Sequence, residues 1–494
     1  MAKQAKARAK RNSITLRNQL ILIPAVAFIA KLFIIARIQG FDWYATSNGD
    51  MAAGLKTLLD QNYAPANAWY GADAENYLRS WLGLLNEGFF SKEGNLHYWP
   101  AGYPLLIWII GFMGQGSTLA LLAILQSLLY FVACAFFVDQ IRQTRLVSFS
   151  FPIAFFLTIN PTLALNTISI GYELPTASLV LVSISALVRY FRLDKSSIIT
   201  VDSLIASFSF ALATLMQPRL FLFAIALIVM WAFAKFTTKS AATFIVIGIV
   251  ITLIGPGLMV YRNSQAMGFA AISTNLGVTM NIGAGDEATG GYSSKAKGVV
   301  CPTVDGTAAE VDSARVRCVI TWYLKNPGKS LRLAWNKSVY FWSPWFGPVA
   351  NGTMARNPWR INHPLNETVK SQSGAQMIYG SLGKVISWLW LLSGLFFLFW
   401  GFRFLWRTGG LERLWGTAAF ILVTTNWVSS IVTIGDHRFR IPTMTLSLVL
   451  QVIGFTSLFL NKRKRLIGPG TDIAWPGLHW KRKSEDDNLR PDKA

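Results

Sequence analysis

Carboxylates stand at the polar ends of hydrophobic segments in this chain, where they could act as acids or bases. Asp50, Asp73 and Glu75 follow the first such segment, and Glu173 opens a later one. Partial desolvation raises the pKa of a carboxylate and makes it a better general base near neutral pH. We predict that Asp73 is the general base and that Glu75 and Glu173 are further catalytic residues, with Asp50 as the alternative base.

Arginines and a lysine at similar positions could hold a phosphate group. A guanidinium binds two phosphate oxygens at once and keeps its charge when it is partly dehydrated. In order of preference, the candidates are Arg438, Arg440, Arg219 and Lys337. With neighbouring polar and aromatic side chains included, the predicted substrate-binding residues are Tyr77, Tyr103, Arg219, Lys337, Asp436, His437, Arg438 and Arg440.

Several of these residues also have a purely structural interpretation. Glu173 could orient an acceptor, hold Arg438, or stand at a helix start that the helix dipole favours. Arg438 and Arg440 could be ordinary anchors at the membrane interface, and Tyr77 could serve packing alone. These alternatives stay open at the level of the sequence.

A divalent cation is possible at the first acidic pair. Asp73 and Glu75 could together hold Mg²⁺ or Mn²⁺, which prefer oxygen ligands. Arginines could neutralise a phosphate without a metal, so the sequence does not decide between the two.

The composition assigns most of the chain to a membrane. The 494 residues are 52% hydrophobic and 14% charged, with a mean hydropathy of +0.39, whereas soluble domains carry about 25% charged residues. A formal net charge of +22 in so apolar a chain is typical of basic flanks on the cytoplasmic side of membrane spans, and we expect no nucleic-acid partner. The sequence predicts an all-α, multi-pass membrane protein, in the plasma membrane if its source is bacterial.

About ten hydrophobic segments predict transmembrane helices. Basic clusters between them place both termini on the cytoplasmic side. A further apolar stretch at 105–113 is about half as long as a span requires, so we interpret it as a surface or re-entrant helix. The predicted spans lie at about 20–38, 119–138, 148–165, 174–191, 202–216, 219–235, 241–261, 380–402, 414–434 and 441–461.

Two large polar loops, 41–104 and 262–379, are predicted on the extracytoplasmic side. The first should be ordered, because it is rich in aromatic residues and contains a helical apolar pattern. The second holds Cys301 and Cys318, which could form a disulfide if the loop faces an oxidising space. The predicted domains are a basic cytoplasmic tail at 1–17, a transmembrane domain at 18–461 and a disordered cytoplasmic tail at 462–494.

All candidate residues fall on one side of the membrane in this topology. Acids and arginines from distant parts of the chain can therefore meet at one lipid–water boundary. The alternative function, a lipid or sugar transporter or flippase, predicts ionisable groups near the middle of the membrane and repeated or broken helices. A membrane scaffold with a binding loop would not depend on the outer acids. The one-sided arrangement favours an enzyme.

Several motifs resemble those of the GT-C superfamily of glycosyltransferases, such as dolichyl-phosphate-mannose protein mannosyltransferases and aminoarabinose transferases. Asp73 and Tyr77, followed by Gly88 and the run Tyr98–Leu106, are similar to the first-loop pattern of this superfamily. Further along the chain, the segments that agree are Leu215–Arg219, Ser273–Gly283, Ala288–Tyr292, Asn326–Gly328, Lys337, Phe341–Trp342 and Asp436–Pro442.

The resemblance implies a membrane enzyme that moves a sugar from a polyprenyl-phosphate carrier to a glycan, lipid or protein acceptor on the extracytoplasmic face. Asp73 would match the first-loop catalytic acid, and the reaction would be an inverting single displacement through an oxocarbenium-like state. Two features depart from the superfamily pattern. Ala74 separates Asp73 from Glu75, where the acids are often adjacent, and Pro218 precedes Arg219 instead of following it.

Overall fold

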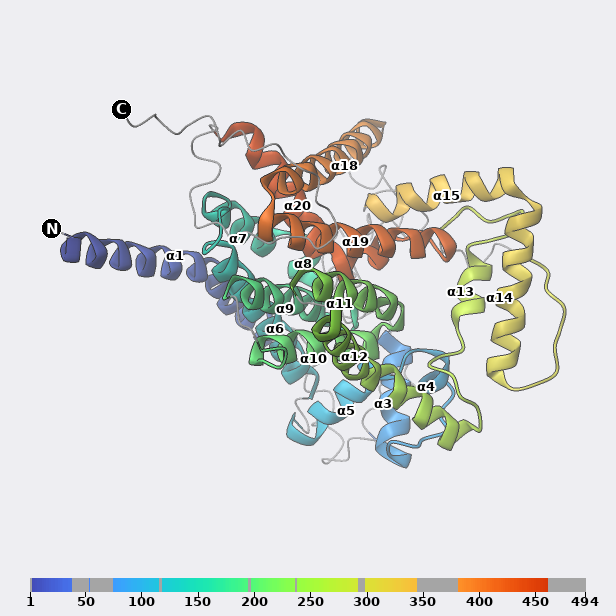
Figure 1. Ribbon diagram of the computed structural model, residues 1–494. Coiled ribbons are helices and arrows are strands. Elements are labelled where there is room, and N and C mark those ends of the chain that lie inside the picture. Colours follow the sequence, from blue (N-terminus) through green and yellow to red (C-terminus); the bar gives the residue numbers. More distant parts are fainter. Residues whose placement is uncertain are drawn as a thin grey trace.

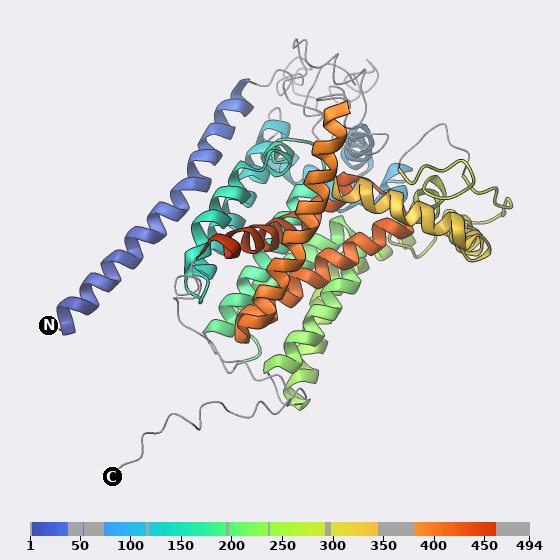
Figure 2. The ribbon, with the colours of Figure 1, turned by 90° about the horizontal axis from the view of Figure 1, so that it is seen from above.

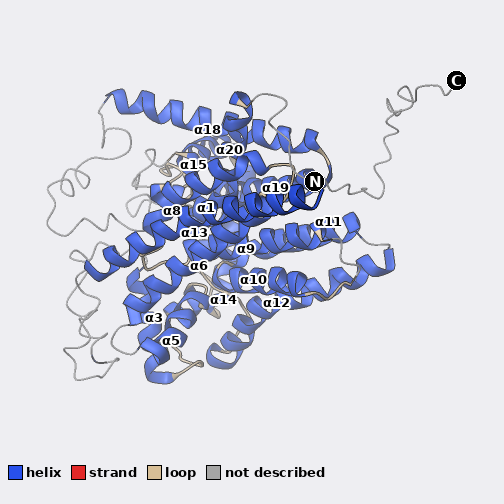
Figure 3. Cartoon of the chain, turned by 90° about the vertical axis from the view of Figure 1, so that its left-hand side faces the viewer, coloured by secondary structure: helices blue, strands red, loops and turns tan. Residues whose placement is uncertain are grey.

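The computed structural model of the chain describes residues 2–37, 53, 74–114, 118–193, 197–235, 238–291, 298–343 and 381–460. Within these residues the secondary structure is helical and contains no β-strand (Figure 1 and Figure 3). The all-α architecture predicted from the sequence is confirmed for this part of the chain.

Among the described residues, six helices are long and apolar enough to cross a membrane. Four further apolar helices are shorter: α10, for example, has 16 residues and rises about 24 Å, less than the roughly 30 Å of a hydrocarbon core. The predicted number of about ten spans is therefore not confirmed. The long helices are α6 (Thr118–Ile141), α9 (Glu173–Arg192), α12 (Thr238–Met267), α18 (Ser381–Thr408), α19 (Gly410–Val432) and α20 (Ile441–Phe459), and the shorter apolar ones are α5 (Gly102–Gly114), α7 (Ser150–Ile159), α10 (Val201–Met216) and α11 (Phe221–Lys235).

Two predicted boundaries differ from the structure. The segment 148–165 is not one span, because α7 ends at Ile159 and a separate short helix, α8 (Pro161–Asn166), follows. Pro161 lacks the amide hydrogen that a continuous helix needs, and it disfavours the helical conformation at Asn160. At the N-terminus, α1 (Ala2–Arg37) runs unbroken from the basic tail into the first predicted span.

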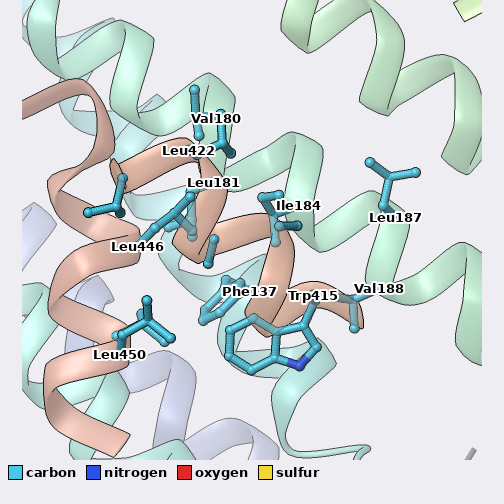
Figure 4. Packing of buried hydrophobic residues seen from close by; sticks show 14 of the residues in the cluster. Phe137, Val180, Leu181, Ile184, Leu187, Val188, Trp415, Leu422, Leu446 and Leu450 are labelled. Atoms are coloured by element: carbon cyan, nitrogen blue, oxygen red, sulfur yellow. The ribbon is translucent and has the colours of Figure 1, made fainter. Parts of the chain in front are cut away.

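Helix α9 forms the centre of the bundle. Of its most apolar 18-residue stretch, 89% is buried inside the protein, so neighbouring helices cover nearly all of it. Figure 4 shows Val180, Ile184 and Val188 of α9 among the buried side chains of neighbouring helices. Phe137 of α6 meets Trp415 of α19 edge to face in the same cluster, with ring centroids 5.9 Å apart.

Glycines allow α18 and α20 to pack backbone against backbone. A Cβ atom at Gly401 would collide with the carbonyl of Leu450, and one at Gly454 would collide with the carbonyl of Phe397. Small residues at such crossings are typical of helices that pack inside a membrane.

The described parts of the two polar loops are folded into helices at one end of the bundle. The first loop contains α3 (Ala74–Glu87) and α4 (Asn95–Tyr98), and the second contains α13 (Leu276–Ile282), α14 (Ala308–Lys325) and α15 (Pro327–Trp342). Figure 1 and Figure 2 show α13–α15 on the side of the bundle opposite the N-terminus of α1.

The apolar pattern predicted for the first loop matches the packing of α3. Tyr77, Leu78, Trp81 and Leu84 are buried and Leu85 is half-buried. The first loop is thus folded at 74–104, as predicted, whereas 41–52 and 54–73 lie outside the described residues.

Cys301 and Cys318 form a disulfide bond that ties the segment before α14 to the middle of that helix. The disulfide considered from the sequence is therefore present in the structure.

Candidate active site

A buried ion pair joins two distant parts of the chain at the α13–α15 end of the bundle. Glu173 begins α9, and Arg438 lies in the short helix η5 (His437–Arg440). Nε of Arg438 donates to Oε1 of Glu173 at 2.7 Å, and the two side chains are 14% and 1% exposed. Two of the contacts considered for Glu173 are thus present in the structure: it pairs with Arg438, and it stands in the first turn of α9.

Asp436 fixes the turn that presents Arg438. Its Oδ1 accepts a hydrogen bond from the backbone N–H of Arg438 at 2.9 Å and so caps η5. Gly435 allows this turn to lie against α15, because a Cβ atom there would overlap the backbone of Lys337. The N–H of Gly435 donates to the carbonyl of Gly290 at 2.8 Å.

Arg219 lies next to this ion pair. Its guanidinium carbon is 5.0 Å from the centre of the Phe439 ring, and that of Arg438 is 5.5 Å from the same centre. The charge of Arg219 interacts with those of Glu173 and Arg438. Two guanidinium groups therefore lie beside the carboxylate of Glu173, and the carboxylate of Asp436 caps the same turn.

A tyrosine cluster connects α3 and α5 to the start of α9. The Tyr77 ring meets Tyr103 at 5.1 Å and Tyr172 at 6.2 Å, both edge to face. The hydroxyl of Tyr103 accepts from the N–H of Gly171 at 2.9 Å and donates to Oε1 of Gln126 at 2.9 Å. Tyr77 and Tyr103 were predicted to contact a substrate, whereas in the structure both rings are buried in the core.

Gln126 completes this network and was not singled out in the sequence. Its amide donates to the carbonyls of Thr167 and Ser169, at 3.3 and 3.0 Å. The network holds the turn that leads through Gly171 to Glu173. A polar amide inside an apolar span was the available signal, because such groups are costly in a membrane unless they have partners.

Of the three first-loop carboxylates predicted to be catalytic, the structure describes only Glu75. Asp73 and Asp50 lie outside the described residues. Glu75 lies on the exposed face of α3, where Oε1 accepts from Nη2 and Nε of Arg79 at 2.7 and 3.0 Å. Its carboxylate is thus engaged by Arg79, on the face of α3 away from Tyr77. Within the described ranges, no group of three or more His, Cys, Asp or Glu side chains could hold a metal ion.

Lys337 bonds α15 to its neighbours instead of facing Glu173. Its Nζ donates to the hydroxyl of Tyr323 and to the carbonyl of Ile431, both at 2.9 Å. Burial lowers the pKa of Lys337 to about 7. Its ammonium group therefore lies in the contact between α14, α15 and α19.

His437 and Arg440 hold the C-terminal end of α15. Nδ1 of His437 lies 3.1 Å from the carbonyl of Phe341, and Nη1 of Arg440 donates to the carbonyl of Trp342 at 3.3 Å. The last carbonyls of a helix have no partner within it, so side chains of this kind stabilise the helix end. Both residues are buried, and the structure places neither among the groups around Glu173.

Arg262 is a second residue that sequence reasoning missed. Its side chain is fully buried at the end of α12, donates to the carbonyl of Phe89 at 3.2 Å and also bonds the carbonyl of Ser91. It thus anchors the first loop to the start of the second. The only sequence signal was its position directly after an apolar segment.

The arrangement is suited to binding an anion beside a membrane. Arg438 and Arg219 come from turns at the same end of the bundle, and Glu173 and Phe439 hold their guanidinium groups. Groups that are held in place before a ligand binds lose little freedom on binding, which favours affinity.

The sequence matches no protein-family model and no curated protein. Two solved structures are similar in part: an apo oligosaccharyltransferase of Archaeoglobus fulgidus, at 13% identity and a TM-score of 0.42, and the oligosaccharyltransferase AglB of the same organism in complex with an inhibitory peptide and a dolichol-phosphate, at 13% identity and a TM-score of 0.41. The similarity covers 88% and 84% of this chain and half of each of the other chains. With TM-scores below 0.5, neither likeness establishes a shared fold.

Proposed function

We propose that this protein is a membrane glycosyltransferase that takes a sugar from a polyprenyl-phosphate carrier and transfers it to an acceptor. The observation that carries the proposal is the paired site of Arg438 and Arg219 around Glu173 and Phe439. The resemblance of the surrounding motifs to those of GT-C glycosyltransferases supports the choice of substrate.

The two arginines bind the carrier phosphate in this proposal. A carrier lipid keeps its tail among the apolar helices and its phosphate at their polar end, where Arg438 and Arg219 lie. The leaving phosphate gains charge as the glycosidic bond breaks, and fixed guanidinium groups stabilise that charge, each by roughly a few kcal/mol. Glu173 sets the position of Arg438 and is not itself the base.

Asp73 remains the proposed base. It directly precedes Ala74, the buried first residue of α3, and α3 packs through Tyr77 against Tyr172, next to Glu173. A base must take the proton of the acceptor hydroxyl as the new bond forms. Glu75 pairs with Arg79. We therefore assign neutralisation of the leaving phosphate to Arg438 and Arg219, and no proposed step depends on Mg²⁺ or Mn²⁺.

We assign the site to the extracytoplasmic face. Glu173 and Arg192 stand at opposite ends of α9, whose 20 residues span about 30 Å, the thickness of a hydrocarbon core. Basic residues gather at the Arg192 end, as on cytoplasmic faces. The Cys301–Cys318 disulfide ties down α14, which packs against α15, and α15 contacts η5 beside Glu173; a disulfide is expected in an oxidising compartment.

The test uses purified protein, polyprenyl-phosphate sugars extracted from host membranes, and an acceptor extract. Mass spectrometry follows the loss of sugar from the carrier. We expect wild type to consume the donor, and Asp73→Asn to lose at least about 100-fold in rate, as is common for a general base. Glu75→Gln is the matched control and should keep its rate, because Glu75 contacts Arg79 instead of the site.

Equal rates in wild type and Asp73→Asn would remove Asp73 as the base while leaving the transferase intact. No donor consumption in any sample, together with movement of lipid or sugar across liposomes, would replace the transferase by a transporter.

A further inference from the structure

Four arginines and two acids gather at the end of the bundle opposite Glu173. Asp139, near the end of α6, pairs with Arg142 at 2.6 Å and with Arg17 at 3.3 Å. Asp202, in the first turn of α10, lies 3.6 Å from Nε of Arg189. Arg192 donates from Nη2 to the side chain of Gln140 at 3.0 Å.

These groups form one electrostatic cluster. The charge of Arg192 interacts with those of Asp139, Arg142, Arg189 and Asp202. With Arg17 included, four guanidinium groups face two carboxylates, so two positive charges are in excess. Like charges brought this close repel one another, and an added anion would relieve that repulsion.

Arg189 and Arg192 of the cluster are only partly buried. Arg189 keeps a side chain that is 44% exposed. Nε of Arg192 is buried and has no hydrogen-bond partner among the described residues. Both side chains project from the last turn of α9, so they lie where an anion could meet them together.

The surroundings of the cluster are apolar. Leu193, directly after Arg192, is 42% exposed, and Ile199 and Val201, before Asp202, are 59% and 68% exposed. A soluble anion gains nothing from such neighbours, whereas the acyl chains of a lipid would cover them. A guanidinium cluster beside exposed aliphatic side chains is suited to a headgroup phosphate with its chains attached.

We propose that Arg189 and Arg192, with Arg142 and Arg17 beside them, form a binding site for the phosphate of an anionic phospholipid in the leaflet opposite the candidate active site. The site is independent of the proposed transferase reaction, since about 30 Å of α9 separates the two ends. Bound lipid would join α1, α6, α9 and α10 at this end and so stabilise the bundle.

The test uses the full-length protein, purified in a neutral detergent and titrated with phosphatidylglycerol or with phosphatidylcholine of the same acyl chains. Native mass spectrometry counts retained lipid, and thermal unfolding reports stabilisation. We expect phosphatidylglycerol alone to bind tightly and to raise the Tm. In the Arg189→Gln/Arg192→Gln double variant its affinity should fall by about 30-fold, as loss of two arginine–phosphate contacts predicts.

The matched control is Arg403→Gln/Arg407→Gln, which removes two exposed arginines from α18. The end of α18 lies at the same end of the bundle, because the carbonyl of Thr408 accepts from Arg145. This control should bind phosphatidylglycerol as wild type does. The single variant Arg189→Gln, which changes a half-exposed side chain, should give an intermediate affinity and separates loss of binding from loss of folding.

Two results would overturn the proposal. One is equal retention of phosphatidylglycerol by wild type and the Arg189→Gln/Arg192→Gln variant. The other is equal stabilisation by inorganic phosphate or glycerol phosphate at the same concentrations, which would make the ligand a soluble phosphate instead of a lipid.

Discussion

A buried carboxylate needs a cation beside it, and at the candidate active site Arg438 is that cation for Glu173. Removing one member of such a pair leaves a charge inside the protein, at a typical cost of about 3–5 kcal/mol. Single substitutions of Glu173 or Arg438 would therefore mix a loss of folding with a loss of function. Arg219, which packs on Phe439, is the better residue for testing phosphate binding.

Lys337, in the contact of α15 with its neighbours, makes the stability of the folded protein depend on pH. Burial lowers its pKa from 10.5 to about 7 in the folded protein. Between these values the unfolded chain binds one more proton than the folded chain, so stability rises with pH across this window. Below about pH 7 Lys337 is charged in both states and contributes no further dependence.

We expect the Tm of wild type to rise relative to that of Lys337→Met as the pH is raised from 7 to 9. Each pH unit in this window corresponds to at most about 1.4 kcal/mol. Parallel curves for the two proteins would show that Lys337 titrates normally, and that its contacts with Tyr323 and Ile431 do not depend on its charge.

Asp436 and Arg438 were predicted to bind substrate, and the structure shows that both lie in one short turn. Tyr103 and Lys337 were also predicted to bind substrate, but in the structure their hydrogen-bond partners Gln126 and Ile431 come from other helices. Only the packed structure brings those partners into contact, so the sequence could not assign Tyr103 to the scaffold.

Helices α18 and α20 depend on close backbone contact. Gly401 and Gly454 allow the approach, and hydrogen bonds from Trp400 to Ser457 and from Gln451 to the carbonyl of Gly394, at 3.2 and 3.0 Å, flank it. A side chain at the crossing would separate the two helices and lose these contacts.

Gly401→Ala should therefore destabilise the protein by about 1–3 kcal/mol, the typical cost of overpacking. Gly257→Ala is the matched control in another long apolar helix, because a Cβ atom there meets no neighbouring atom. Alanine also favours helix over glycine, so the control should be neutral or slightly stabilised. Thermal unfolding in one detergent compares the two variants, and equal Tm values would contradict the packing seen at Gly401.

The long apolar helices were predictable because hydrophobicity and length are local properties. The α7–α8 break was missed, since the run around Pro161 stays apolar on both sides of the proline. The helices α13–α15 were predicted only as a loop. Their amphipathic faces pack against one another and against α19, and this packing is not visible in a plot of hydropathy.

At the scale of the whole molecule, α9 separates two polar ends with different compositions. One end has Glu173 between arginines from distant turns, and the other has the basic cluster around Arg192. The sequence indicated this polarity through the spacing of basic residues. It could not indicate which arginines meet, since Arg219 and Arg438 are more than 200 residues apart.

The central claim is that Arg438 and Arg219 bind the phosphate of a polyprenyl carrier. The most direct measurement is the Kd of polyprenyl phosphate for the full-length protein in nanodiscs, with wild type, Arg219→Gln and Arg79→Gln compared. Arg79 lies at the same end of the bundle but pairs with exposed Glu75, so its variant changes the net charge without touching the site.

We predict that Arg219→Gln weakens binding by about tenfold or more, the effect of losing one charge-assisted hydrogen bond, while its Tm and the Kd of Arg79→Gln stay near those of wild type. Binding of polyprenyl phosphate with the same Kd in all three proteins would contradict the assignment of this site to the carrier.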